Sequence, residues 1–170
     1  IQWEHSLSPA SLVSLSARYG DRVWNDTERG AATGTAAVIS WSSLFRNDSR
    51  VTGRLFYGDE EARDRSIGYA GRRYLGVELE GRYTLWRDHA PFAGFAWQRS
   101  DYQALDGSGG MPGPTGRNGN SSRVAAGWAW QIESNWDLRA EANYRLADDT
   151  LDAPDSDRTQ FYFSTRYGFR

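Results

Sequence analysis

Two glutamates on one face of a predicted strand, Glu78 and Glu80, are the first candidates for chemistry in this sequence. Carboxylates two residues apart along a strand point the same way, which is an arrangement that suits paired acid–base catalysis. Arg82 follows on the same face, however, and carboxylates with guanidinium neighbours also form purely structural ion pairs. We therefore expect Glu78 and Glu80 to belong to an ion-pair network.

Histidine and cysteine offer little further chemistry. The only histidines are His5 and His89, and neither has a nucleophile and an acid at a spacing that would suggest a Ser-His-acid site. The chain has no cysteine, so neither a disulfide framework nor a thiolate metal site is expected. We predict a non-enzymatic protein without a cofactor.

Acidic residues gather in two predicted loops, and clusters of carboxylate oxygens can hold Ca²⁺. Their spacing does not match the calcium loop of an EF-hand, and acidic loops are more often simply solvated, so we predict no metal site. The two clusters are Asp59, Glu60, Glu61 and Asp64, and Asp148, Asp149, Asp152, Asp155 and Asp157.

Alternation of apolar and polar residues indicates β-strands with two different environments. The C-terminal stretch, residues 161–170, is the clearest example, with aromatic residues on one face and polar ones on the other. Such a strand with a near-terminal Phe is typical of the end of an outer-membrane barrel, which has lipid outside and a wet lumen inside. The same alternation predicts nine strands, over residues 1–7, 12–19, 35–45, 51–57, 74–86, 92–102, 123–132, 136–145 and 161–170.

The predicted connections fall into two classes. Short turns lie at 8–9, 46–49, 87–89 and 134–135, whereas long polar loops lie at 25–34, 58–66, 104–122 and 146–157. Outer-membrane barrels combine short periplasmic turns with long extracellular loops in this way.

Composition favours the same class of protein. The net charge of −2 gives no basic surface for nucleic acid. No run reaches the roughly 20 apolar residues of a spanning helix, but a barrel needs only alternate residues to face lipid. A soluble β-sandwich would alternate too, but its apolar face would need a second sheet. We therefore predict an all-β, antiparallel transmembrane β-barrel of eight or more strands in the bacterial outer membrane.

The alternation assigns side chains to two environments. Charges in the lumen need partners or water, and two alternatives stay open: a conduit whose charges set selectivity or contact a cargo, or a salt-bridged plug that fills a narrow barrel. The predicted lumen-lining residues are Arg18, Arg54, Glu78, Glu80, Arg82, Arg123, Asp137, Arg139, Glu141, Arg145 and Arg166. The predicted membrane-facing residues are Leu75, Val77, Leu79, Trp128, Trp130, Trp136, Phe161, Phe163, Tyr167 and Phe169. Trp86 is among the tryptophans expected to include the interfacial girdles; because it alternates inward, the alternative is that it packs in the lumen.

Nine strands is an odd number, whereas bacterial single-chain barrels have an even number. Either residues 1–7 are not a barrel strand, or further strands complete a larger barrel of which this is a C-terminal part. We favour the second alternative, because residues 1–7 alternate well and a turn at Ser8-Pro9 follows them.

Several segments resemble one known family. The sequence reads GRLFYGDEEARD at 53–64, GRRYLGV at 71–77, WQRSDY at 97–102, NWDLRAE at 135–141 and DRTQ at 157–160, before the final strand. Over most of residues 50–170 this resembles the C-terminal barrel of the surface lipoprotein assembly modifier (Slam-like) family. The resemblance implies a barrel that follows a periplasmic tetratricopeptide domain and helps lipoproteins to reach the cell surface.

Three functions stay open from the sequence. The first is Slam-like export, the second an exopolysaccharide-export or general porin barrel, and the third a small structural or adhesin barrel with a plugged lumen. The expected partners are outer-membrane lipids, an exported lipoprotein or polysaccharide and other chains that complete the barrel, but no nucleic acid.

Overall fold

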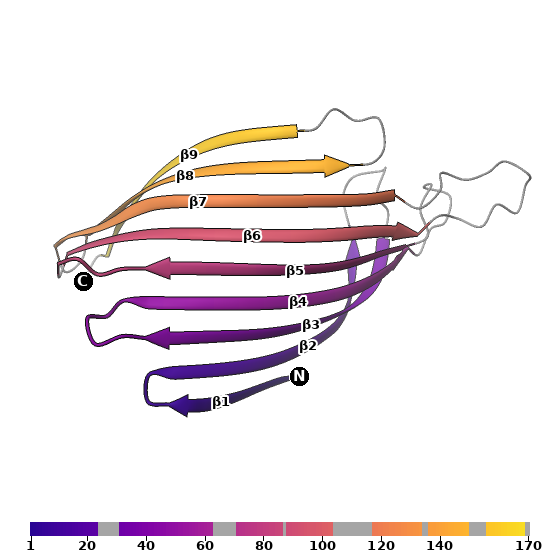
Figure 1. The fold of residues 1–170 in the computed structure, drawn as a ribbon, viewed down its shortest axis with the longest axis horizontal. Coiled ribbons are helices and arrows are strands. Elements are labelled where there is room, and N and C mark those ends of the chain that lie inside the picture. Colours follow the sequence, from indigo (N-terminus) through magenta and orange to yellow (C-terminus); the bar gives the residue numbers. More distant parts are fainter. Residues whose placement is uncertain are drawn as a thin grey trace, which may run out of the picture.

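The protein is a single antiparallel sheet of nine strands, in which each strand pairs with the next along the chain (Figure 1). The computed structural model describes residues 1–23, 31–62, 71–86, 88–103, 117–133, 136–149 and 156–168. The strands are β1 (Gln2–Ser8), β2 (Ser11–Val23), β3 (Ala31–Leu44), β4 (Arg50–Ala62), β5 (Gly71–Arg82), β6 (His89–Gln103), β7 (Arg117–Glu133), β8 (Trp136–Asp149) and β9 (Ser156–Tyr167). The described residues contain no helix, and hence none long and apolar enough to cross a membrane. The prediction of an all-β chain with nine antiparallel strands is confirmed.

The strands run further toward the long connections than the hydrophobic pattern predicted. Beyond the apolar residues, the backbone ladder continues through polar sequence, and cross-strand ion pairs hold it together. Arg72 of β5 lies 2.8 Å from Glu60 of β4. The predicted loops were therefore too long: residues 31–34, 58–62, 117–122, 146–149 and 156–157 are strand.

The β5–β6 connection also differs from the prediction. The predicted strand 74–86 ends at Arg82, after which the chain turns back with a single bridge between Trp86 and His89. Trp86 is 64% exposed and packs edge-on against the His89 ring. The strand that would carry the alternation to Trp86 stops four residues earlier, so the alternation no longer places this side chain, and both alternatives for it stay predictions.

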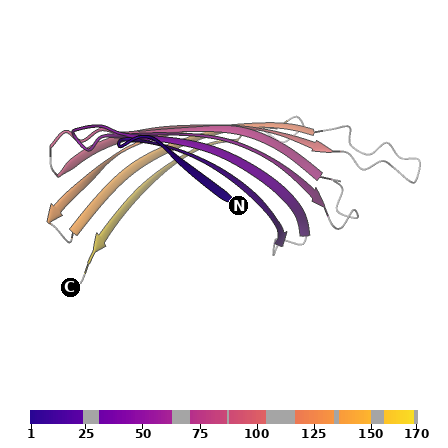
Figure 2. The ribbon, with the colours of Figure 1, turned by 90° about the horizontal axis from the view of Figure 1, so that it is seen from below.

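The sheet is bent into an open trough (Figure 2). Among the described residues β1 pairs only with β2 and β9 only with β8, so the sheet is not closed. With nine strands in a meander, β1 and β9 run in the same direction and cannot join by an antiparallel ladder. Closure into a barrel stays a prediction.

Glycines on the concave side make room for the bend. Three aromatic rings on this side each lie over the glycine that is directly opposite on a neighbouring strand. A Cβ at any of these glycines would overlap the ring. Gly kinks covered by cross-strand aromatics are a known way to curve a sheet without losing packing. The three pairs are Phe56 with Gly76, Tyr74 with Gly58 and Phe92 with Gly127.

Full burial of hydrophobic side chains is rare in the described sheet. Ala90 and Phe92 are the only buried hydrophobic residues that the described part of the chain contains, and Phe92 lies on the concave side. The convex side has no second layer over it, since the described strands all belong to one sheet. The sheet therefore lacks the two-layer core of a soluble β-sandwich.

Candidate functional site: the two faces of the sheet

The convex face is a continuous apolar surface open to solvent. Leu79 is 50% exposed and Phe163 81% exposed, and their strand neighbours of the same parity are similar. We call this surface the apolar belt. It runs across β2 to β9 and comprises Val13, Leu15, Ile39, Trp41, Leu55, Tyr57, Leu75, Val77, Leu79, Phe95, Trp97, Val124, Trp128, Trp130, Trp136, Leu138, Tyr144, Leu146, Phe161, Phe163 and Tyr167. Soluble monomers rarely expose apolar patches beyond a few hundred Å², so an exposed apolar surface that crosses the sheet from β2 to β9 is a candidate interaction surface.

Polar groups border the apolar belt on the side of the long connections. The row directly beyond Tyr57 and Leu75 holds an ion pair between Asp59 and Arg73, 3.2 Å apart. A second pair, Arg99 with Asp101 at 3.2 Å, continues the border on β6. On the convex face, the residues next in line after the last apolar ones, two positions further along each strand, are therefore charged.

An aromatic cluster borders the belt on the side of the short turns. The Trp128 indole N–H donates to Nδ1 of His89 at 3.0 Å, and the Trp130 ring stacks on His89 with centroids 5.3 Å apart. Trp86 completes the cluster. Indole and imidazole rings combine an apolar body with a polar N–H, which suits a boundary between apolar and aqueous surroundings.

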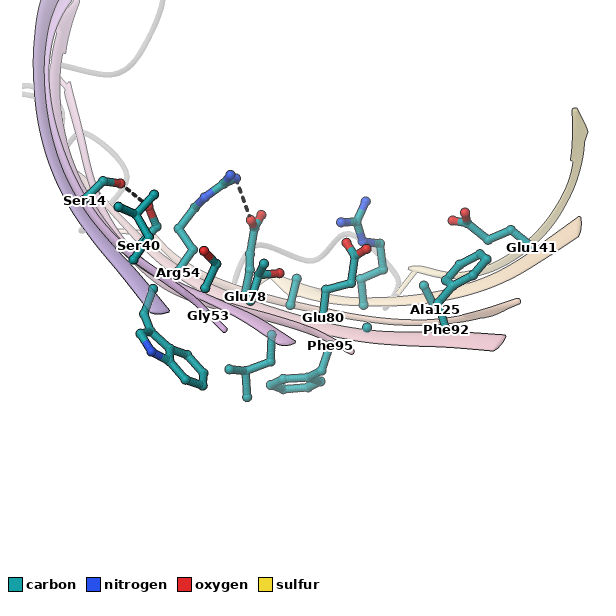
Figure 3. Close-up of a pocket in the computed structure, with 18 of the residues that line it drawn as sticks. Ser14, Ser40, Gly53, Arg54, Glu78, Glu80, Phe92, Phe95, Ala125 and Glu141 are labelled. Carbon is teal, nitrogen blue, oxygen red and sulfur yellow. Dashed lines mark hydrogen bonds and ion pairs between the residues drawn. The ribbon is translucent and has the colours of Figure 1, made fainter. Parts of the chain in front are cut away.

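The concave face carries the charged and polar side chains. Figure 3 shows Arg54, Glu78 and Glu141 pointing into the trough, while Phe95 points away from it. Arginines outnumber acidic residues on this face, although the whole chain has a net charge of −2. The described concave arginines are Arg18, Arg50, Arg54, Arg72, Arg82, Arg123, Arg139, Arg145, Arg158 and Arg166; the acids are Glu4, Glu60, Glu78, Glu80, Asp137 and Glu141.

Some of these charges are paired and others are not. Arg54 lies 2.9 Å from Glu78, and Arg139 lies 2.7 Å from Glu141 with its guanidinium over the Phe92 ring. Glu80 has no ion pair with any described residue. The ion-pair network predicted for both glutamates is therefore confirmed for Glu78 and wrong for Glu80, which faces Thr52 and Gly94 in the register rather than an arginine.

The structure places every residue predicted to line a lumen on the concave face. The residues predicted to face a membrane all lie on the convex face, except Phe169, which is outside the described residues. His5 stacks on Trp3 on the convex face and His89 lies in the aromatic cluster. Hydroxyl pairs inside the trough, such as Ser14 with Ser40 at 2.6 Å, were not predicted from the sequence, because only the strand register brings them together.

Some residues of the two acidic clusters are paired, and others lie outside the described residues. Asp59 and Glu60 are paired with arginines in the β4–β5 ladder. Asp64, Asp152 and Asp155 are outside the described residues. Within the described ranges, no three His, Cys, Asp or Glu side chains gather closely enough to hold a metal ion.

Two ion pairs of the trough differ in burial. Glu60 and Arg72 are only 9% and 22% exposed, whereas Glu78 and Arg54 are 37% and 56% exposed. We expect Glu60→Gln to lower the free energy of unfolding by about 1–3 kcal/mol, because it leaves a shielded guanidinium without its partner. Glu78→Gln should cost no more than about 1 kcal/mol, since water screens an exposed pair. Urea titrations of both variants check this ranking, and equal losses would contradict it.

Comparisons with protein-family models, with curated protein sequences and with solved structures found no match to this chain.

Proposed function

We propose that this chain forms part of the wall of a bacterial outer-membrane β-barrel, with the apolar belt against lipid and the concave face toward an aqueous lumen. The observation that carries the proposal is the apolar belt itself: large side chains such as Leu79 and Phe163 are open on a face with no covering layer. A lipid bilayer is a partner that fits a surface curving around the outside of a trough.

The height of the apolar belt supports a bilayer as the partner. On β8 the convex residues are apolar from Trp136 to Leu146. Ten residue steps of about 3.4 Å span roughly 34 Å along the strand. A tilt of about 40°, usual for barrel strands, reduces this to roughly 26 Å along the membrane normal. Outer-membrane barrels have an apolar band about 25 Å tall.

The open trough favours a conduit over a plugged interior. Arg54 and Arg139 keep 56% and 49% of their side chains exposed despite their ion pairs. A small closed barrel would bury such groups against each other. We therefore infer a role in transport or export across the outer membrane.

The Slam-like hypothesis, in which the cargo is a lipoprotein, rests on the sequence resemblance alone. The exopolysaccharide or porin alternative draws on a specific observation, namely that the trough is polar and rich in arginine. Such a lining suits a hydrophilic anionic cargo.

Reconstitution tests the proposal directly. The intact protein should resist carbonate extraction from outer membranes, and its strands should be protected from protease in lipid vesicles. Purified protein in planar bilayers should carry a stable ionic current. Recovery of the folded chain in the soluble fraction would end the membrane proposal, whereas insertion without current would end the conduit proposal alone.

A further inference from the structure

A hollow in the trough carries acidic and basic side chains in equal number. It has a volume of about 380 Å³ and crosses the concave face from β2 to β8 (Figure 3). Two ion pairs, Arg54 with Glu78 at 2.9 Å and Arg139 with Glu141 at 2.7 Å, account for four of its charges. The charged side chains of the described residues that line the hollow are Arg54, Glu78, Glu80, Arg123, Arg139 and Glu141.

Glu80 and Arg123 are the two charges that these pairs leave over. Both side chains are exposed, and neither forms an ion pair with any described residue. Arg123 interacts electrostatically with Glu141, but Glu141 is already bonded to Arg139. Glu80 points into the trough (Figure 3). The hollow therefore offers one accessible carboxylate and one accessible guanidinium to a ligand.

The two charges stand apart across a floor of small residues. Glu80 on β5 lies directly opposite Gly94, and Arg123 on β7 lies directly opposite Ala96. Two strand spacings of about 4.8 Å and an offset of two residues put the Cα atoms of Glu80 and Arg123 roughly 12 Å apart. The floor between them is formed by Gly94, Ala96 and Ala125, whose side chains are at most a methyl group. A small molecule can therefore lie along the sheet and contact both charges.

A hydroxyl group adds to the acidic side of the hollow. Thr52 lies directly opposite Glu80 and lines the same hollow. Its hydroxyl forms no hydrogen bond with any described residue. A primary ammonium group has three N–H donors, so beside Glu80 it can donate to the carboxylate, to this hydroxyl and to water.

We propose that this hollow binds a small zwitterion, a molecule with a primary ammonium group at one end and a carboxylate at the other. The ammonium donates to the Glu80 carboxylate and the Thr52 hydroxyl. The ligand carboxylate accepts hydrogen bonds from the forked N–H donors of Arg123. The chain between the two groups lies on the floor of small residues. The volume of the hollow is in the range of small-molecule sites.

The charges of the hollow favour a zwitterion over a simple ion. An anion at Arg123 would leave Glu80 without a partner, and a cation at Glu80 would do the same to Arg123. The trough as a whole has an excess of arginine and suits anions, but in this hollow acids and bases are equal in number. The site deepens the proposed conduit by naming a class of solute, and only its transport role rests on the membrane proposal.

Three related ligands test the proposal by titration calorimetry on the intact protein in detergent solution. We expect 6-aminohexanoate to bind about fivefold more tightly than 6-hydroxyhexanoate, which lacks the ammonium group. It should also bind about fivefold more tightly than 6-aminohexanamide, which lacks the carboxylate. A factor of this size is the upper range for one exposed ion pair. Equal binding of the three ligands to the parent protein would overturn the proposal without recourse to any variant.

Two variants assign each end of the ligand to its partner. Glu80→Gln should abolish the advantage over 6-hydroxyhexanoate, because the ammonium has lost its carboxylate. Arg123→Gln should abolish the advantage over 6-aminohexanamide, because the ligand carboxylate has lost its guanidinium. An advantage that survives both changes would place the zwitterion elsewhere on the protein.

Arg18→Gln is the matched control. Arg18 is an exposed arginine of the concave face without an ion pair among the described residues, but it lies on β2 outside the hollow. This change should alter the binding of 6-aminohexanoate by less than about twofold. Equal losses in Arg18→Gln and Arg123→Gln would mean bulk electrostatics rather than a site.

Thr52→Arg blocks the site without removing either charge. The new guanidinium lies directly opposite Glu80 and competes with the ligand ammonium, so 6-aminohexanoate should bind about fivefold more weakly. Unchanged binding would count against the proposed place of the ammonium. Because these assays use detergent, loss of binding with normal insertion into vesicles would overturn this site alone. Binding without insertion would overturn the membrane proposal alone.

Discussion

Leu79→Arg is expected to lower the free energy of unfolding in a lipid bilayer by about 2–4 kcal/mol. The variant is less stable because it places a charge on the face that we assign to the hydrocarbon. Leu79 is 50% exposed in the middle of the apolar belt, between Gly53 and Phe95 on the neighbouring strands. In a water-soluble sheet the same change would be nearly neutral, since exposed surface substitutions shift stability by only about 0.5 kcal/mol. Urea titration of the protein folded in lipid vesicles measures the difference.

Thr52→Arg is the matched control on the other face. Thr52 lies directly opposite Glu80 in the trough. The new guanidinium can therefore pair with the Glu80 carboxylate, which has no ion pair among the described residues. We expect this variant to stay within about 1 kcal/mol of the parent protein. Equal destabilisation by the two arginines would contradict the assignment of the faces.

Gly76→Val is expected to lower the free energy of unfolding by about 1–3 kcal/mol or more, because the new side chain overpacks the concave face. A Cβ at Gly76 would overlap the Phe56 ring and would lie 2.7 Å from the backbone carbonyl oxygen of Trp97. This oxygen cannot move away without disturbing the pairing of β5 with β6, so the larger side chain would distort the bend of the sheet at this point. Chemical denaturation in detergent or vesicles measures the loss.

Two further variants isolate the cause of that loss. Gly81→Val adds the same side chain to the same strand, but a Cβ there meets nothing within 4 Å, so stability should be unchanged or improved. The double variant Phe56→Ala, Gly76→Val should lose less stability than the sum of the two single losses, because the ring that clashes with the new valine is absent. Additive effects in the double variant would mean that the ring over Gly76 does not set the local packing.

The strand number and the faces of the sheet were predictable from sequence because both depend on local alternation. Leu75, Val77 and Leu79 alternate with Glu78 and Glu80, and the period of two survives in the observed strand β5. A slip of one residue would move every side chain to the other face, so the pattern fixes the two faces strongly.

The ends of the strands were not predictable from hydrophobic pattern. Residues 58–62 and 117–122 are polar, and they continue their strands through backbone ladders and pairs such as Arg72 with Glu60. At the β5–β6 turn the predicted strand was instead too long, because a turn follows Arg82 and interrupts the alternation before Trp86. Contacts between strands, rather than local pattern, decide these positions.

The arrangement of charges on the concave face depended on register in the same way. Arg123, Arg145 and Arg158 are far apart in sequence, and nothing in their spacing aligns them. Only the pairing of β7 with β8 and of β8 with β9 places them side by side.

The central claim is that the convex face meets lipid and the concave face meets water. The chain has no native cysteine, so single cysteines at positions 75 to 80 of β5 can each carry one spin label in lipid vesicles. We predict that labels at 75, 77 and 79 are accessible to lipid-soluble oxygen, whereas labels at 76, 78 and 80 are accessible to a water-soluble nickel chelate. Equal access of the chelate to all six positions would contradict the account.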